Sequence, residues 1–273
     1  MSGGVVFAGI APHPPLLVPT VGGTRIERVQ ASADALKEFS AQLVAARPDT
    51  IALVSPHSPG SMHSFSAFSA PQLSGDFHQF GARQVSLCFE NDLALFELIK
   101  ATAYDNNLPF EPIPEHCSLD HGVLVPMFYL HQAGWRGPLL SLCFSTLSIA
   151  MHIQFGRLLA EAAIGLGRRI AVVASADLSH YLSTDGPYQF EPCAHLFDEQ
   201  ICNAVKNQDL QAIVDIDQEL RYMAGECGYR SILIAIGAVE TATPQPRLLS
   251  YEGPFGVGYL VAILKDSQAT STI

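Results

Sequence analysis

Apolar runs of strand length alternate along the chain with longer stretches in which apolar residues recur at helical spacing. This alternation is typical of α/β layer folds. The run VVFAGIA at residues 5–11 predicts a buried strand, residues 24–46 predict a helix, and TIALVS at residues 50–55 predicts a second strand. The chain therefore opens with one predicted βαβ unit.

The same reading extends to the rest of the chain. Residues 56–82, rich in Ser, Gly, Pro and His, predict a hairpin or a loop over the sheet edge, and residues 107–118 predict a loop. Residues 190–240 are predicted to be mostly helical with a break at 224–229, and residues 268–273 are predicted to form a frayed tail. Further strands are predicted at 84–90, 138–144, 169–175, 247–253 and 255–264, and further helices at 91–104, 120–133 and 149–166. No repeat or linker is visible, so we expect a single catalytic domain over residues 1–273.

Composition narrows the class of protein. Apolar residues make up 48% of the 273 residues and charged residues 15%, which predicts a large core and apolar surface covered by a second copy of the chain in a homo-oligomer. A formal charge of −11 argues against nucleic acid and anionic membrane as partners. There is no signal-peptide pattern and no apolar run long enough to span a membrane, so we expect a cytoplasmic protein.

The six cysteines show no CxxC pair and no spacing typical of structural zinc. Several lie inside apolar runs, such as Cys88 in QVSLCFE and Cys143 in LLSLCF, where a free thiol behaves as a small buried hydrophobe. The sequence thus disfavours a structural zinc site.

Two histidines directly follow the strands of the first βαβ unit, His13 in GIAPHPPLL and His57 in ALVSPHSPG. Ligands of open α/β sheets bind beyond the carboxyl ends of the strands, so two such turns can direct two imidazoles into one crevice. Adjacent prolines stiffen both turns. A single strand-end histidine is more often structural, but the matching pair favours a metal site.

Three more candidates lie where a strand ends or a helix begins: His121 in SLDHGVLVPM, His180 in SADLSHYL and Glu252 in LLSYEGPFGVGY. Two histidines and a carboxylate form the facial set that binds ferrous iron and leaves open positions, and the remaining histidines suit proton transfer. Glu226 in AGECGY is a competing carboxylate. Asp120 and Asp177 are expected to orient neighbouring groups or cap turns.

The motifs APHPPLL, VSPHSPG, LDHGVLVP and SADLSH, followed by the late Glu252, occur in the order found in class III extradiol dioxygenases. The chain resembles this family, which includes the catalytic subunit of protocatechuate 4,5-dioxygenase. The resemblance implies a three-layer α/β sandwich with a central mixed sheet flanked by helices. It also implies Fe(II) on His13, His57 and Glu252, with His121 and His180 as proton donors or acceptors. The implied substrates are O₂ and a small aromatic, a catechol or an o-aminophenol, and some members of the family work with a small partner subunit.

Two alternatives remain open. Memo-type proteins are more distant relatives that act in metal-binding or redox roles without ring cleavage, and their pattern replaces the carboxylate with a cysteine. The presence of Glu252 favours the dioxygenase over that alternative. A zinc hydrolase could also use a ligand set of two histidines and a glutamate, since zinc accepts it with one open position.

Overall fold

A mixed eight-stranded sheet forms the centre of the protein in a computed structural model that describes residues 3–241 and 244–267. The residues of the predicted tail, 268–273, lie outside the described residues. Four neighbouring strands run parallel in the middle of the sheet, in the order β7 (Leu139–Cys143), β2 (Thr50–Ser55), β8 (Arg169–Ser175) and β1 (Gly4–Ala11). On one side the antiparallel strands β10 (Tyr259–Asp266) and β9 (Arg247–Glu252) continue the sheet, and on the other side β3 (Phe65–Phe68) and β6 (Phe110–Ile113) complete it.

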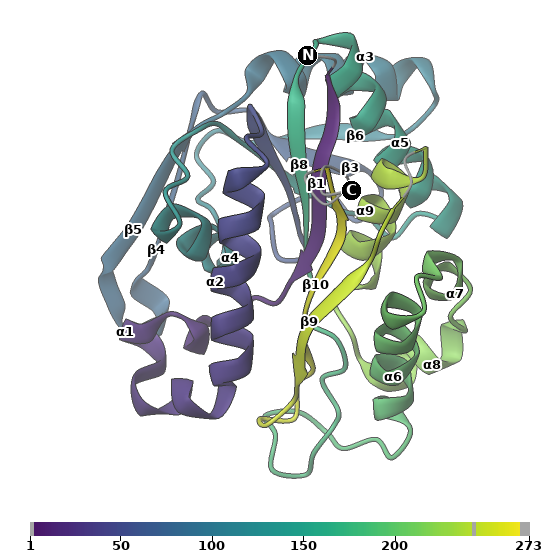
Figure 1. The fold of residues 1–273 in the computed structure, drawn as a ribbon. Helices are drawn as coiled ribbons and strands as arrows, with labels where there is room; N and C mark the ends of the chain where they lie inside the picture. The colour runs from purple at the N-terminus through teal and green to yellow at the C-terminus, as the bar shows by residue number, and fades with distance from the viewer. Residues whose placement is uncertain (1–2, 242–243, 268–273) are drawn as a thin grey trace, which may run out of the picture.

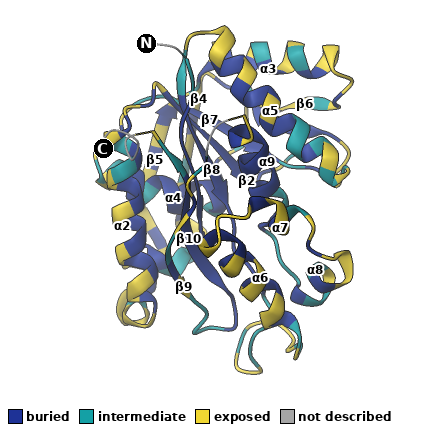
Figure 2. Ribbon diagram, turned by 45° about the vertical axis from the view of Figure 1, so that its right-hand side comes forward, coloured by how far each residue is buried: buried dark blue, intermediate teal, exposed yellow. Residues whose placement is uncertain are grey.

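Helices cover both faces of this sheet (Figure 1). Successive residues of a strand point to opposite faces, and in β8 Val172 belongs to one apolar cluster while Val173 belongs to the other. The central strands are buried nearly throughout (Figure 2). The predicted three-layer sandwich is therefore confirmed. One layer holds α2 (Gln30–Ala45) and α4 (His121–Gln132), and the other holds α3 (Leu93–Asp105), α5 (Ile149–Gly165) and α9 (Tyr229–Val239).

Smaller elements surround the sandwich. A separate two-stranded antiparallel sheet pairs β4 (Gln72–Phe77) with β5 (Ala82–Glu90). Three short helices, α6 (Ala194–Lys206), α7 (Leu210–Val214) and α8 (Gln218–Ala224), lie together on the right of Figure 1. The remaining short elements are η1 (Pro15–Leu17), α1 (Pro19–Gly22), η2 (Gly23–Val29) and η3 (His78–Phe80).

Several elements differ from those predicted. The helix predicted at 24–46 is a 3-10 helix up to Val29 and becomes α-helical only at Gln30, after a chain reversal in which Gly23 adopts a φ of 52°. The strand predicted at 84–90 pairs outside the main sheet, and the loop predicted at 107–118 contributes the edge strand β6. Among the described helices, none is long and apolar enough to cross a membrane.

Candidate metal centre

The structure brings the two strand-end histidines together. His13 lies two residues beyond the end of β1 and His57 two residues beyond the end of β2, and only β8 separates these strands in the sheet. Their Nε2 atoms are 3.1 Å apart, and His13 is buried while His57 is partly accessible. The parallel strands thus place both imidazoles at one edge of the sheet, as their positions in the sequence predict.

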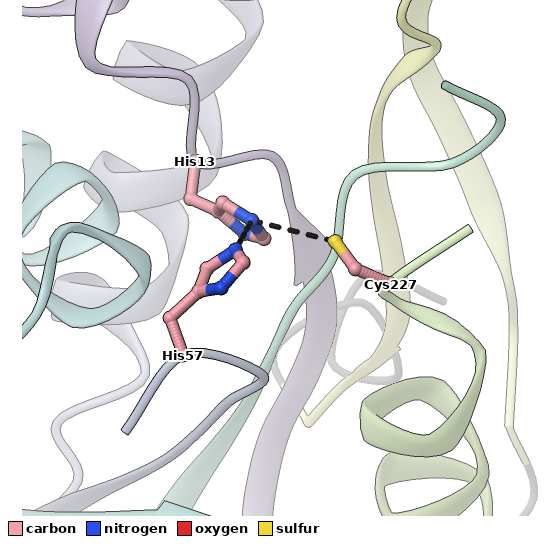
Figure 3. A group of neighbouring side chains, drawn as sticks. All are labelled: His13, His57 and Cys227. Carbon is pink, nitrogen blue, oxygen red and sulfur yellow. Dashed lines mark hydrogen bonds between the residues drawn. The ribbon is translucent and has the colours of Figure 1, made fainter. Parts of the chain in front are cut away.

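The third donor beside them is a cysteine. Cys227 Sγ lies 3.6 Å from His13 Nε2, and one ligand atom from each of the three residues falls within 4.8 Å of the others (Figure 3). Cys227 precedes Gly228, the residue that caps α9. A Cβ atom on Gly228 would lie 2.4 Å from Ala176 Cβ, so glycine allows α9 to begin this close to the end of β8.

The distances fit a bound transition metal. With metal–nitrogen bonds of about 2.05 Å, two ligands on one ion are about 2.9 Å apart at a right angle and about 3.3 Å apart at the tetrahedral angle. The observed nitrogen–nitrogen separation of 3.1 Å lies between these values. A metal–sulfur bond of about 2.3 Å predicts a sulfur–nitrogen separation of about 3.6 Å at the tetrahedral angle, which agrees with the 3.6 Å between Cys227 and His13.

Glu252, the third ligand expected from the sequence, lies apart from this group in the structure. It ends β9, the outermost strand on its side of the sheet, and its Oε1 accepts a hydrogen bond of 2.7 Å from the backbone N–H of Ser32. Ser32 is in the first turn of α2, whose free N–H groups attract a carboxylate. The Glu252 side chain therefore caps a helix, and it is not part of the His13, His57 and Cys227 group.

The competing carboxylate, Glu226, is also outside this group. Its Oε2 accepts a hydrogen bond of 2.6 Å from the backbone N–H of Tyr229, at the start of α9. The neighbouring Cys227 takes the third position instead. Unlike Cys88 and Cys143, Cys227 stands in a glycine-containing break between two helices, and that context was the available signal for a functional thiol.

A serine fixes the tautomer of His13. Ser175, the last residue of β8, donates its hydroxyl proton to the carbonyl oxygen of Gly122 at 2.5 Å, and the same Oγ lies 2.9 Å from His13 Nδ1. Because a hydroxyl has a single proton, Oγ accepts the proton of Nδ1–H. His13 Nε2 is then left with a free lone pair that points toward His57 and Cys227, as a metal ligand requires.

Two aspartates hold the loops of the centre in place. Asp177 Oδ1 accepts the backbone N–H of His13 at 2.8 Å. Asp120 caps α4 and accepts the hydroxyl protons of Ser55 and Ser58, which flank His57, at 2.7 Å each. The orienting and capping roles expected for Asp120 and Asp177 are therefore confirmed.

His121 and His180 border the same centre. The His121 ring stacks on that of His57 with centroids 4.4 Å apart, and it lies 5.7 Å from the ring of His13. Burial and, to a smaller extent, His57 lower the pKa of His180, while its contacts with the backbone of Leu178 and Gly225 raise it. The Nδ1 atom of His180 is buried and makes no hydrogen bond of good geometry among the described residues. The rings of His13, His57 and His121 thus lie with their centroids 4.4 to 5.7 Å apart at the carboxyl end of the sheet.

Burial sets the protonation of these groups. It lowers the pKa of His13 well below its usual value, with further lowering from the neighbouring histidines, and it lowers the pKa of His121 to about 4. It also lowers the pKa of His57 and His180. The imidazoles are therefore neutral near pH 7, the form that binds metals and accepts protons. Burial raises the pKa of Cys227, so its thiolate needs a compensating cation.

Comparisons with known proteins agree with this fold. Over 264 aligned residues the chain is 30% identical to Protein CA_C1420 of Clostridium acetobutylicum. The aligned region covers 94% of this chain and 56% of that relative. The chain thus spans about half the length of this curated relative. The crystal structure of protein JW3007 from Escherichia coli K12 superposes with a TM-score of 0.54 at 18% identity, covering 83% of this chain and 91% of that one, which shows a shared fold.

The family comparison covers most of the chain. Residues 8–262 match the family described as the catalytic LigB subunit of aromatic ring-opening dioxygenase. This span includes every residue of the centre described above, from His13 to Cys227. The chain therefore belongs to the LigB family of aromatic ring-opening dioxygenase catalytic subunits.

Proposed function

We propose that this protein binds Fe(II) through His13, His57 and Cys227 and opens a catechol-type or o-aminophenol-type ring with O₂ at a bond outside the diol. The observation that carries the proposal is the gathering of the imidazoles of His13, His57 and His121 and the thiol of Cys227 at the carboxyl ends of the parallel strands. The description of the family supports the ring-opening class of reaction.

The charge of the ligand set suits ferrous iron. Two neutral imidazoles and one anionic sulfur leave Fe(II) with a net charge of about +1, as two imidazoles and a carboxylate would. Three protein ligands leave further coordination positions open. Iron bound here would hold the diol and O₂ side by side and let electron density pass from the ring to oxygen.

The two remaining histidines are proposed to handle protons. His180 has a buried Nδ1 without a hydrogen bond of good geometry among the described residues, and we propose that a hydroxyl group of the substrate becomes its partner. As a neutral imidazole it can accept the first hydroxyl proton of a catechol and return it later in the reaction. His121, stacked on His57, is in reach of the same region and is proposed to serve as a second donor or acceptor.

The test begins with protein reconstituted with Fe(II) under argon. A panel of substituted catechols and o-aminophenols is added, air is admitted, and oxygen uptake is recorded together with the visible spectrum. We expect oxygen uptake and a yellow product, because extradiol cleavage gives a conjugated semialdehyde or its aminated analogue. A colourless muconate would contradict cleavage outside the diol.

A second candidate function is metal binding or redox chemistry without ring cleavage, as in Memo-type proteins. The observation that favours it is Cys227, which takes the place that a carboxylate has in the dioxygenases. Tight metal binding by His13, His57 and Cys227 together with no oxygen uptake across the panel would decide for this candidate. Metal analysis of protein purified anaerobically separates iron from zinc, and activity that depended on zinc would favour a hydrolase.

A further inference from the structure

We propose that a cavity between the start of α5, helix α8 and the start of α9 binds the carboxylate or phosphate group of a small anion. The cavity has a volume of about 800 Å³, within the range of small-molecule sites. Two arginines line it, Arg221 from α8 and Arg230 from α9, together with the first residues of α5. This site is separate from the proposed iron ligands and does not depend on the proposed reaction.

The two guanidinium groups are held in place but lack acceptors. Arg221 stacks over the ring of Tyr229 at 4.4 Å, and Arg230 lies over the ring of Phe144 at 5.9 Å. Neither side chain makes a hydrogen bond or an ion pair within the described part of the chain, and Arg221 Nε is buried without a partner. Buried donors normally find an acceptor. A planar anion with two oxygens would supply acceptors to both guanidinium groups.

The N-terminus of α5 adds to the positive potential of the cavity. Ile149 and Ala150 both line it and form the first turn of this 17-residue helix. The Ser148 side chain caps the helix by accepting from the backbone N–H of Met151, so it leaves the N–H groups of Ile149 and Ala150 available. Such N–H groups, with the positive end of the helix dipole, stabilise a bound anion.

Glu226 is the acidic residue in the wall of the cavity: burial raises the pKa of its carboxyl group, and the charges of Arg230 and Arg221 lower it, so one carboxylate faces two guanidinium groups. Its carboxyl group accepts the backbone N–H of Tyr229, and among the described residues no ion pair joins it to Arg221 or Arg230. The chain as a whole carries a formal charge of −11, which repels anions at a distance. Two unpaired arginines on one cavity of such a protein therefore indicate local recognition of an anion.

The cavity and the metal centre share a wall. Gly225 and Glu226 line the cavity immediately before Cys227, and the backbone N–H of His180 donates to the carbonyl oxygen of Ala224 at 2.9 Å. Tyr181, the residue after His180, also lines the cavity. An anion bound here would lie against the segment that carries Cys227.

The experiment uses calorimetric titration of the protein with inorganic phosphate and, separately, with benzoate, in a buffer free of other oxyanions. We expect at least one probe to bind, and the two probes distinguish a phosphate site from a carboxylate site. Arg221→Met and Arg230→Met should each weaken binding by about tenfold or more, the effect of losing a hydrogen bond to a charged group. Methionine keeps the unbranched apolar stem of the arginine side chain but lacks the guanidinium group, and circular dichroism checks that both variants fold.

Arg83→Met is the matched control, because Arg83 is exposed on β5 outside the cavity and its loss should leave binding unchanged. His13→Ala removes a proposed iron ligand and should also leave anion binding unchanged, so failure of the metal centre is distinguishable from failure of this site. If neither probe binds at millimolar concentration, or if both arginine variants bind as the unaltered protein does, no anion site exists here.

Discussion

Ser175 Oγ accepts a hydrogen bond from His13 Nδ1 at 2.9 Å and donates one to the carbonyl oxygen of Gly122. Because this arrangement keeps the lone pair of His13 on Nε2, Ser175→Ala should reduce metal affinity by about 10- to 100-fold, the usual effect of removing such a supporting bond. The dissociation constant of Co(II) or Zn(II), obtained by competition with a chelator, measures this change.

Ser141 offers a matched control for that substitution. It is a buried serine on β7, which β2 separates from β8 in the sheet. Its hydroxyl has no hydrogen-bond partner among the described residues. Ser141→Ala should leave metal affinity unchanged. Equal losses in the two variants would mean that Ser175 acts only through packing.

Separate substitutions of Cys227, the proposed third ligand, and Glu252, the ligand expected from the sequence, distinguish their roles. Cys227→Ala should abolish stoichiometric metal binding and the sulfur-to-cobalt charge-transfer absorption of the Co(II) form. Glu252→Ala should keep both but lower the free energy of unfolding by about 1 kcal/mol, because it removes a side chain that caps α2. Urea unfolding and metal analysis measure the two effects, and the reverse pattern would return Glu252 to the centre.

His180→Ala should retain metal yet slow ring opening by about 10² to 10⁴-fold, the range for loss of a general acid or base. His121→Ala should show a smaller loss of the same kind. Turnover is measured by oxygen uptake at equal iron content. Loss of iron in the His180 variant would mean that His180 is a ligand.

The sequence predicted the strands that carry the centre better than the centre itself. The strand predicted at 5–11 is β1, which begins one residue earlier, and the strand predicted at 50–55 was placed correctly, because short apolar runs between turn residues mark buried strands. These two strands were enough to locate His13 and His57. The position of Cys227 depends on how closely α9 approaches Ala176, which is a packing relationship between distant segments. The pairing of β4 with β5 outside the main sheet likewise depends on tertiary contacts.

We expect the protonation of His152 to lower the free energy of unfolding at acidic pH. This side chain is buried away from the metal centre, with its two ring nitrogens near the carbonyl oxygens of Ser148 and Ser145, and burial lowers its pKa from 6.5 to about 4. Between these two values the unfolded chain binds more protons than the folded one, so the free energy of unfolding decreases as the pH falls. At pH 5 the decrease from this group is on the order of 2 kcal/mol.

His152→Gln, which cannot take up this proton, should be less stable at pH 7 but should lose less stability between pH 7 and pH 5. Urea unfolding at pH 7 and at pH 5 gives the change in the free energy of unfolding with pH for the variant and for the unaltered protein. His63→Gln, at an exposed position, is the control. Its free energy of unfolding should change between pH 7 and pH 5 as that of the unaltered protein does. If the free energy of unfolding of the His152 variant depends on pH as in the unaltered protein, the acid sensitivity belongs to other groups.

The position of Cys227 also has a consequence for the chain as a polymer. His13 and Cys227 are separated by 214 residues, so an ion shared between them would act as a cross-link that closes most of the chain into a ring. The ligands of such an ion come together only in the folded chain, so an ion that is released on unfolding adds its binding free energy to that of folding. Melting temperature and metal occupancy should therefore rise together, with chelation loosening α9 from the end of β8 before the sheet itself separates.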